Sequence, residues 1–213
     1  MQPAVNGARS NIGVSNDECV ADQTSRRSEG DNKCLSASRS GHKVPSGRSA
    51  DADDVKALVY VNAFIPDVGE SVFDLLGGSG SALAVEDPST VFDFAGYPGA
   101  PEGDIEAFLK PSAVHDAFAQ DLAETDRGLI AATQRPIALG ANIAPTESAA
   151  WTSIPSWAVI GTEDRVIPAA TQRRMAERAH ATISEVEASH VSMVSQPQAT
   201  IDAVVAAAAA SEG

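Results

Sequence analysis

The stretch that decides the fold is SWAVIGTED, at residues 156–164. Its apolar half, residues 157–160, is typical of a parallel strand that is buried on both faces. A polar turn that carries Asp164 then ends the run. A helical stretch follows at about 169–180, and a β-branched strand at 182–186 leads into a loop with His190. This alternation of strand and helix predicts an α/β protein built on a parallel sheet.

The chain before this stretch divides into parts that differ in apolar content and in predicted secondary structure. Residues 55–64 are an almost continuous apolar run that predicts a second buried strand, and Pro66 closes it because proline cannot donate to a ladder. Residues 68–150 carry short apolar groups and helical stretches at about 112–122 and 126–134. We interpret residues 68–150 as a helical lid insertion over an edge of the sheet.

The last helix is predicted from two signals. Residues 195–198 read SQPQ, which is typical of a capping box in which Ser195 accepts from the third amide and Gln198 reaches back. Apolar residues at helical spacing then predict the face that docks onto the sheet, and they are Ile201, Val204, Val205 and Ala208.

The N-terminal quarter of the chain differs in composition from the rest. Residues 1–54 contain no aromatic residue and are rich in Ser, Gly, Asn, Asp and Arg. Such a segment buries too little apolar area to offset the entropy lost on ordering. We therefore predict that residues 1–54 are disordered or not homologous to the rest, and that residues 55–213 are the folded portion. Cys19 and Cys34 both lie in the first segment and are expected to be free thiols.

Charge and hydropathy exclude several classes of partner. Residues 55–213 hold 8 Lys and Arg against 21 Asp and Glu, and this acidity argues against nucleic acid or an anionic membrane surface. No run of about 18 apolar residues could span a membrane, and the N-terminus lacks the apolar region of a secretory signal. We therefore expect a cytoplasmic protein. No paired Cys/His spacing suggests zinc, so neither a metal nor another cofactor is expected.

Asp164 and His190 follow different strands of the predicted sheet. Ligands of open parallel sheets bind at the carboxyl ends of the strands, and the two side chains become neighbours there if their strands pair. An aspartate bonded to one imidazole nitrogen fixes the tautomer of the ring and leaves the other nitrogen as a general base. The pair therefore predicts acid–base chemistry. On spacing alone an alternative stays open, in which Asp164 caps the following helix and His190 is a polar loop residue.

Several longer motifs resemble the α/β-hydrolase superfamily. They are IPSW at 154–157, GTEDRVIP at 161–168, QRRM at 172–175, ASHVSMVSQP at 188–197 and VYVNAFIPDVGES at 59–71. The branch that they resemble most is the lid-bearing esterases related to plant methylester esterases and hydroxynitrile lyases. The resemblance covers about residues 55–210.

This resemblance implies an incomplete α/β-hydrolase fold, with a parallel sheet, helices on both faces and a helical lid. It also implies a Ser-His-Asp triad in which Asp164, rather than the adjacent Glu163, is the acid and His190 is the base. In the lyases a lysine directly follows the histidine. Val191 stands at that place here, which favours hydrolysis of a small apolar ester-like substrate.

The serine of that triad has no counterpart in the sequence. The family carries it on a G-x-S-x-G turn, which should precede the first predicted strand, but residues 41–47 read GHKVPSG. Lys43 then occupies the nucleophile position, and the hydroxyls of Ser46 and Ser49 lack the turn. The nucleophile is therefore unknown. We interpret residues 1–54 as an unrelated or out-of-frame start joined to the C-terminal portion of a hydrolase.

These departures predict little or no ester hydrolysis by the chain as written, because the oxyanion hole and the nucleophile supply most of the stabilisation of the transition state. Two alternatives stay open. One is a non-catalytic protein that binds a small apolar ligand, and the other is a truncated, inactive fragment. The sequence leaves the oligomeric state open.

Overall fold

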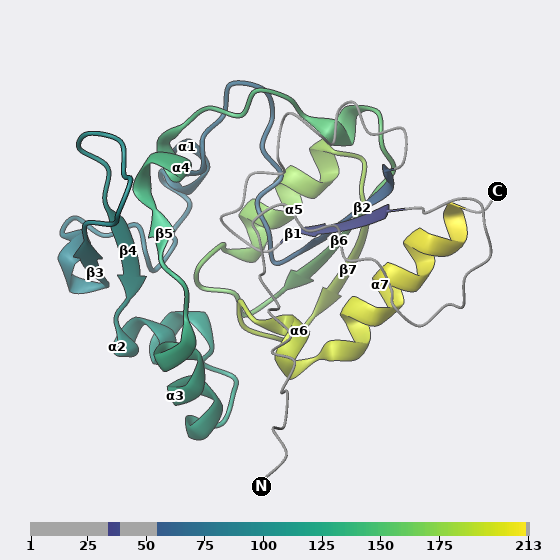
Figure 1. Cartoon of the computed structure of the whole chain (residues 1–213). Helices are drawn as coiled ribbons and strands as arrows, with labels where there is room; N and C mark the ends of the chain where they lie inside the picture. Colours follow the sequence, from purple (N-terminus) through teal and green to yellow (C-terminus); the bar gives the residue numbers. More distant parts are fainter. Residues whose placement is uncertain (1–33, 39–54, 212–213) are drawn as a thin grey trace, which may run out of the picture.

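A parallel sheet of four strands forms the centre of the protein (Figure 1). The computed structural model describes residues 34–38 and 55–211. The strands lie in the order β1-β2-β6-β7, with the bounds Cys34–Ser38, Val55–Val61, Ser156–Gly161 and Thr182–Val186. Every neighbouring pair is parallel, so the predicted fold class is confirmed.

Alternate residues of the two central strands, β2 and β6, face opposite sides of the sheet, and a helix covers each side. These helices are α5, Ala169–Arg178, and α7, Pro197–Ala210. Leu58 packs in one buried cluster with Met175 of α5, whereas its neighbour Val59 packs in the other with Ala203 of α7. Strands that are apolar in every position suit this arrangement because both of their faces are buried. In the described parts of the chain, no helix is both long enough and apolar enough to cross a membrane.

Helix α7 docks through a face that only partly matches the one predicted. Ala203 and Ala207 are buried against the sheet, whereas Ile201 and Val205 are 50% and 60% exposed. The small alanine side chains, four residues apart, let the helix axis approach the sheet closely. Ile201 and Val205 are therefore left on the outer side, and the predicted docking face is wrong at these two positions, whereas Val204 packs against the buried cluster as predicted.

The predicted capping box of α7 is also wrong. Ser195 is the last residue of a separate short helix, α6, Ser192–Ser195. The N-cap of α7 is Gln196, which makes no side-chain capping bond, and Pro197 occupies the first turn. Because Ser195 already belongs to a helix, its backbone lacks the extended conformation that an N-cap needs.

The segment between β2 and β6 lies beside the main sheet (Figure 1). The second predicted helix is α3, Glu124–Thr133, and the first is α2, Pro111–Ala113, continued by a π-helical turn, η2, Val114–Phe118. A small antiparallel sheet in the order β3-β4-β5 was not predicted. Its strands are too short to show an alternating pattern, with the bounds Phe92–Ala95, Glu106–Leu109 and Ile137–Ala138. The remaining short helices are α1, Val72–Leu76; η1, Pro88–Thr90; α4, Leu139–Ile143; and η3, Ala150–Thr152.

Arg178, at the end of α5, ties together the two ends of this insertion. Its Nη1 and Nη2 atoms each donate to a carboxylate oxygen of Glu70 at 2.7 Å. The hydrogen bond from Arg178 holds the pKa of the Glu70 carboxyl below its ordinary value. The guanidinium carbon also lies 5.8 Å from the ring centre of Trp151, whose indole N–H donates to the Pro66 carbonyl at 2.8 Å. The entry and the exit of the insertion therefore both contact Arg178 of α5.

Strand β1 lies in the segment for which the sequence predicts no regular structure. It pairs with β2, with Leu35 opposite Ala57 and Ser38 opposite Tyr60. A ladder is built from backbone groups, so a polar stretch can form a strand beside an apolar one. The predictions about the cysteine thiols and about the nucleophile position concern side chains that lie outside the described part of the chain. These side chains belong to Cys19, Cys34, Lys43, Ser46 and Ser49.

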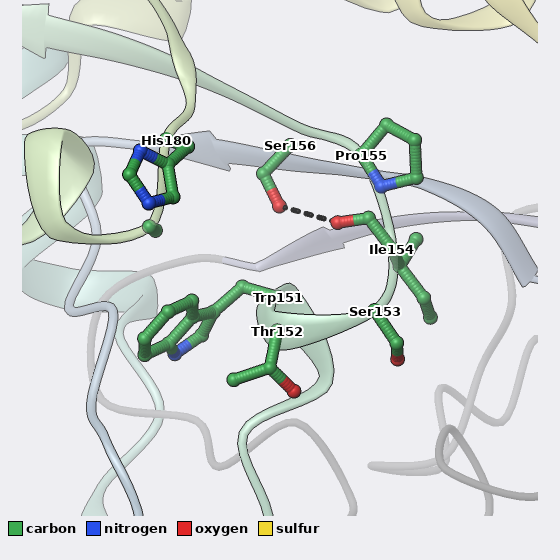
Figure 2. Close-up of a pocket in the computed structure, with 8 residues that line it drawn as sticks. Trp151, Thr152, Ser153, Ile154, Pro155, Ser156 and His180 are labelled. Carbon is green, nitrogen blue, oxygen red and sulfur yellow. Dashed lines mark hydrogen bonds between the residues drawn. The ribbon is translucent and has the colours of Figure 1, made fainter.

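An open pocket lies at the N-terminal end of β6 (Figure 2). It is lined by residues 151–156 together with Ala179 and His180. Its hydroxyls donate to nearby backbone carbonyls, as Ser156 Oγ does to the Ile154 carbonyl at 3.1 Å. Ligands of parallel sheets bind at the carboxyl ends of the strands, which is the opposite end of β6. The candidate site is therefore expected at the carboxyl end of β6.

The two faces of α7 can be told apart by substitution. Ala207→Leu is expected to destabilise the protein by about 1–3 kcal/mol because it forces extra methylenes into a packed contact. Ile201→Ser is expected to change the free energy of unfolding by less than about 0.5 kcal/mol, since half of that side chain is already exposed. Urea unfolding followed by circular dichroism measures both. A larger loss for Ile201→Ser than for Ala207→Leu would contradict the docking described above.

Candidate active site

Asp164 lies just beyond the end of β6, and its side chain is completely buried. Its Oδ1 atom accepts hydrogen bonds from the backbone amides of Val166 and Ile167, at 2.8 and 2.9 Å. The carboxylate thus closes the tight turn that follows the strand. These bonds hold Oδ1 in place and direct Oδ2 to the other side.

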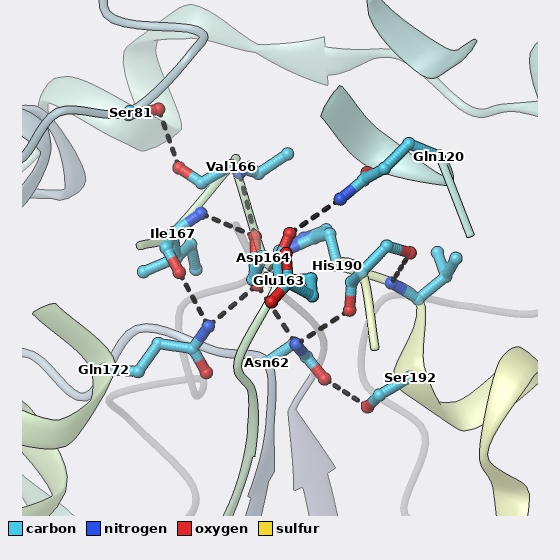
Figure 3. Close-up of polar contacts among 12 residues, drawn as sticks. Asn62, Ser81, Gln120, Glu163, Asp164, Val166, Ile167, Gln172, His190 and Ser192 are labelled. Carbon is cyan, nitrogen blue, oxygen red and sulfur yellow. Dashed lines mark hydrogen bonds and ion pairs between the residues drawn. The ribbon is translucent and has the colours of Figure 1, made fainter. Parts of the chain in front are cut away.

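The Oδ2 atom of Asp164 faces His190 (Figure 3). The Nδ1 atom of His190 lies 2.8 Å from Oδ2, and the imidazole is buried with 2% of its side chain exposed. Gln172 Nε2 and Asn62 Nδ2 also donate to Oδ2, at 2.8 and 3.1 Å. Because a carboxylate oxygen only accepts hydrogen bonds, Nδ1 of the imidazole is the donor in this contact.

The N-terminal end of α5 bears on the alternative in which Asp164 is a helix cap. The N-cap of α5 is Pro168, and no side chain caps that helix. The alternative in which Asp164 is a helix cap is therefore wrong. The neighbouring Glu163 is exposed, and its backbone carbonyl rather than its carboxylate contacts the insertion, through Gln120 Nε2 at 2.6 Å.

Asn62 joins the loops that follow three strands. It is the first residue after β2, is buried, and has a φ of 46°, a left-handed conformation that asparagine tolerates better than most residues. Its Nδ2 atom donates both to Asp164 and to the Ser189 carbonyl, at 3.1 and 3.2 Å. Its Oδ1 atom accepts from the hydroxyl of Ser192, which is also buried.

Gly161 makes room for this junction. A Cβ atom at this position would lie 2.5 Å from Asn62 Nδ2 and 2.7 and 2.8 Å from the carbonyl oxygens of Ala188 and Ser189. Side-chain atoms do not approach backbone oxygens that closely without displacing them. The glycine that ends β6 is therefore required by the meeting of the three loops.

The insertion covers His190 from the outside. The ring of Phe118 lies 4.9 Å from the imidazole, between ring centres. Asp121 Oδ2 accepts from the amide of Ser189 at 2.9 Å, and Arg165 Nη1 donates to the Asp116 carbonyl at 2.8 Å. Burial raises the pKa of Asp121, but hydrogen bonds from Ser189 outweigh this and leave the pKa below its ordinary value. The insertion thus contacts both the acid loop and the histidine loop.

A second part of the insertion holds the acid loop from the opposite side. Ser81 Oγ donates to the carbonyl of Val166 at 2.7 Å, and the amide of Ala82 donates to the carbonyl of Arg165 at 2.8 Å. Ser81 is buried, so the contact is shielded from water. Figure 3 shows Ser81 and Gln120 approaching the turn around Asp164 from different directions.

Sequence reasoning found the two central residues of this site and missed their partners. Asp164 and His190 were predicted, and the structure brings them together. Asn62, Gln172 and Asp121 were given no role, because amides and a lid carboxylate carry no spacing signal of their own. The one available signal for Asn62 is a polar residue directly after an apolar strand. The nucleophile was left unknown, and the segment before β2, where the family carries it, lies outside the described side chains.

Residues 20–203 match the profile described as "Alpha/beta hydrolase family". The chain belongs to the α/β-hydrolase family. The match starts at residue 20, so it includes part of the segment before β2. No curated protein sequence matches the chain.

Solved structures of several enzymes share the fold at low sequence identity. A structure of polyneuridine aldehyde esterase is 22% identical, with a TM-score of 0.66, over 82% of this chain and 71% of that one. A methylesterase from Arabidopsis is 14% identical, with a TM-score of 0.58, over 83% and 70%. Tomato Methylketone Synthase I, complexed with 2-tridecanone, is 15% identical, with a TM-score of 0.64, over 84% and 72%. Two of these three neighbours are esterases by name.

The close approach at Gly161 can be tested by adding one methyl group. Gly161→Ala is expected to destabilise the protein by about 1–3 kcal/mol, since the new Cβ must displace Asn62 or the two carbonyls. Gly128, in α3, is the matched control because a Cβ there meets nothing within 4 Å. Gly128→Ala is expected to stabilise the protein by roughly 0.5–1 kcal/mol through helix propensity. Equal effects of the two substitutions in urea unfolding would contradict the role of Gly161.

Proposed function

We propose that this chain carries the acid–base part of a carboxylic-ester hydrolase, with Asp164 as the orienting acid and His190 as the general base. The observation that carries the proposal is the 2.8 Å bond between His190 Nδ1 and Asp164 Oδ2, two side chains that are both buried. We assign the hydrolase portion to residues 55–213 and the lid to about residues 68–150.

The proposed chemistry follows from the direction of that bond. Nε2 of His190 takes the proton of an attacking hydroxyl while the hydroxyl oxygen adds to the ester carbonyl. The negative charge of Asp164 stabilises the imidazolium that forms, and the ring then gives the proton to the leaving alcohol. Water repeats the sequence on the acyl intermediate and releases the acid. Two backbone amides, Gln172 and Asn62 all donate to the Asp164 carboxylate and hold it against the imidazole.

The surroundings of His190 support a small apolar substrate. Val191, the residue after the histidine, is buried in an apolar cluster with Val114 and Ala119 of the insertion, and Phe118 packs at its edge. No cationic side chain occupies the place of Val191, so a charged leaving group would find no partner there. The neighbours named above as esterases, and one that is complexed with a long-chain ketone, favour the same class of ligand.

The nucleophile is the open part of the proposal. The buried hydroxyl of Ser192 donates to Asn62, and the Ser189 hydroxyl accepts from the Val191 amide at 3.4 Å. The proton of the Ser192 hydroxyl is thus used in the bond to Asn62. The sequence holds no G-x-S-x-G turn. We therefore propose that the chain as written hydrolyses esters poorly or not at all.

An esterase assay tests this directly. With p-nitrophenyl butyrate, the full chain is expected to release p-nitrophenol no faster than its His190→Ala variant, because no activated serine is available. The assay is run at matched protein concentrations after circular dichroism shows that both variants are folded. Robust turnover that His190→Ala abolishes would contradict the prediction and would show that a hydroxyl acts as the nucleophile.

The absence of a G-x-S-x-G turn from the sequence also favours a second candidate function, the non-catalytic binding of a small apolar ligand. Saturable binding of a medium-chain methyl ketone without turnover, weakened by substitution of Phe118, would support it. Hydrolysis would exclude it.

The acid–base pair itself is tested by Asp164→Asn. Both oxygens of Asp164 accept hydrogen bonds, so an amide at this position turns its NH₂ group towards existing donors. We expect a loss of about 1–3 kcal/mol in the free energy of unfolding for the unsatisfied groups. We also expect the proton to move from Nδ1 to Nε2 of His190, because the amide becomes the donor. Two-bond ¹H–¹⁵N correlation spectra of the imidazole measure the tautomer, and an unchanged Nδ1–H form in the variant would contradict the pairing.

A further inference from the structure

We propose that Asn62 is a positioning residue that holds Asp164 and His190 in register. The inference rests on the proposed function of that pair. It adds Asn62, a residue outside the triad that the sequence did not predict as part of the site. Its basis is a buried hydrogen-bond chain that runs from Ser192 through Asn62 to Asp164 and then to His190.

The orientation of the Asn62 amide is fixed by its partners. Nδ2 faces two oxygens, Asp164 Oδ2 and the Ser189 carbonyl, and neither can donate. Oδ1 faces the Ser192 hydroxyl, which can. A flipped amide would set its oxygen against two acceptors in a buried site, which is costly. The amide therefore has a single satisfied orientation, and Ser192 secures it.

The backbone of Asn62 is held as firmly as its side chain. Its amide N–H donates to the Val159 carbonyl of β6 at 2.9 Å, and its left-handed φ of 46° aims the side chain into the junction. Asparagine and glycine adopt this conformation with the least strain. Glycine at position 62 would therefore keep the backbone and remove only the amide.

Asn62 acts on the Asp164–His190 pair through Asp164 Oδ2, the oxygen that also contacts His190 Nδ1. Asp164 Oδ2 receives bonds from His190, Gln172 and Asn62 together. Asn62 also bonds the carbonyl of Ser189, the residue directly before His190. One side chain thus fixes both the acceptor atom of the pair and the loop that carries the donor. Gln172 bonds only the acid loop, through Asp164 and the Ile167 carbonyl.

The experiment follows the Nδ1 proton of His190 by NMR, because it reports the pair without any need for turnover. In the full chain we expect the Nδ1–H tautomer and a proton that exchanges slowly with water. In Asn62→Gly we expect exchange to rise at least about tenfold, the factor for losing one hydrogen bond to a charged group. Ser192→Ala keeps the amide and frees its orientation, so we expect a smaller rise in the same direction.

The control is Ala207→Leu, which destabilises the packing of α7 on the sheet without touching the junction. It is expected to leave the exchange of the Nδ1 proton unchanged. Equal rises in Ala207→Leu and Asn62→Gly would mean that exchange occurs by global unfolding and would overturn the positioning role. A protected proton that persists in both Asn62→Gly and Ser192→Ala would overturn it as well. Loss of the Nδ1–H form in the unsubstituted chain would overturn the acid–base pair itself, a result distinct from the other two.

Discussion

A carboxylate buried beside an imidazole must have all of its hydrogen bonds satisfied, and the architecture around Asp164 follows from that requirement. An unpaired buried charge costs several kcal/mol, so each oxygen needs donors at fixed positions. Backbone amides of the turn after β6 serve Oδ1, while His190, Gln172 and Asn62 serve Oδ2. These donors come from three separate segments of the chain. The site therefore exists only when the segments after β2, β6 and β7 are brought together.

The same assembly explains residues that carry no chemistry. Gly161 lacks a side chain because the amide of Asn62 and two carbonyls occupy the space. The main chain at Asn62 is left-handed because the side chain must turn back across the end of β6. Below this edge, the alternating apolar residues of β2 and β6 join α5 on one face and α7 on the other. The core thus supports the strand ends at which the polar junction is built.

The insertion is part of the site as well as a cover for it. Residues 114–121 contact the histidine loop through Phe118 and Asp121, and Ser81 contacts the acid loop. Arg178 secures the base of the insertion by its ion pair with Glu70 and its contact with Trp151. A π-helical turn lies where this segment reaches His190, and such turns recur at functional sites. The position of the insertion is therefore coupled to the geometry of the acid–base pair.

The sequence by itself determined the elements whose signals are local. Continuous apolar runs identified β2 and β6, the β-branched stretch identified β7, and the strand-end positions of Asp164 and His190 identified the pair. Tertiary structure alone decided the rest. Ala203 and Ala207 form the docking face of α7 because the helix and the sheet approach closely. The short strands of the insertion form only because they pair with one another. Asn62 and Gln172 became part of the site because folding brings distant segments onto one buried oxygen, and a buried charge selects its donors by position in space rather than by spacing along the chain.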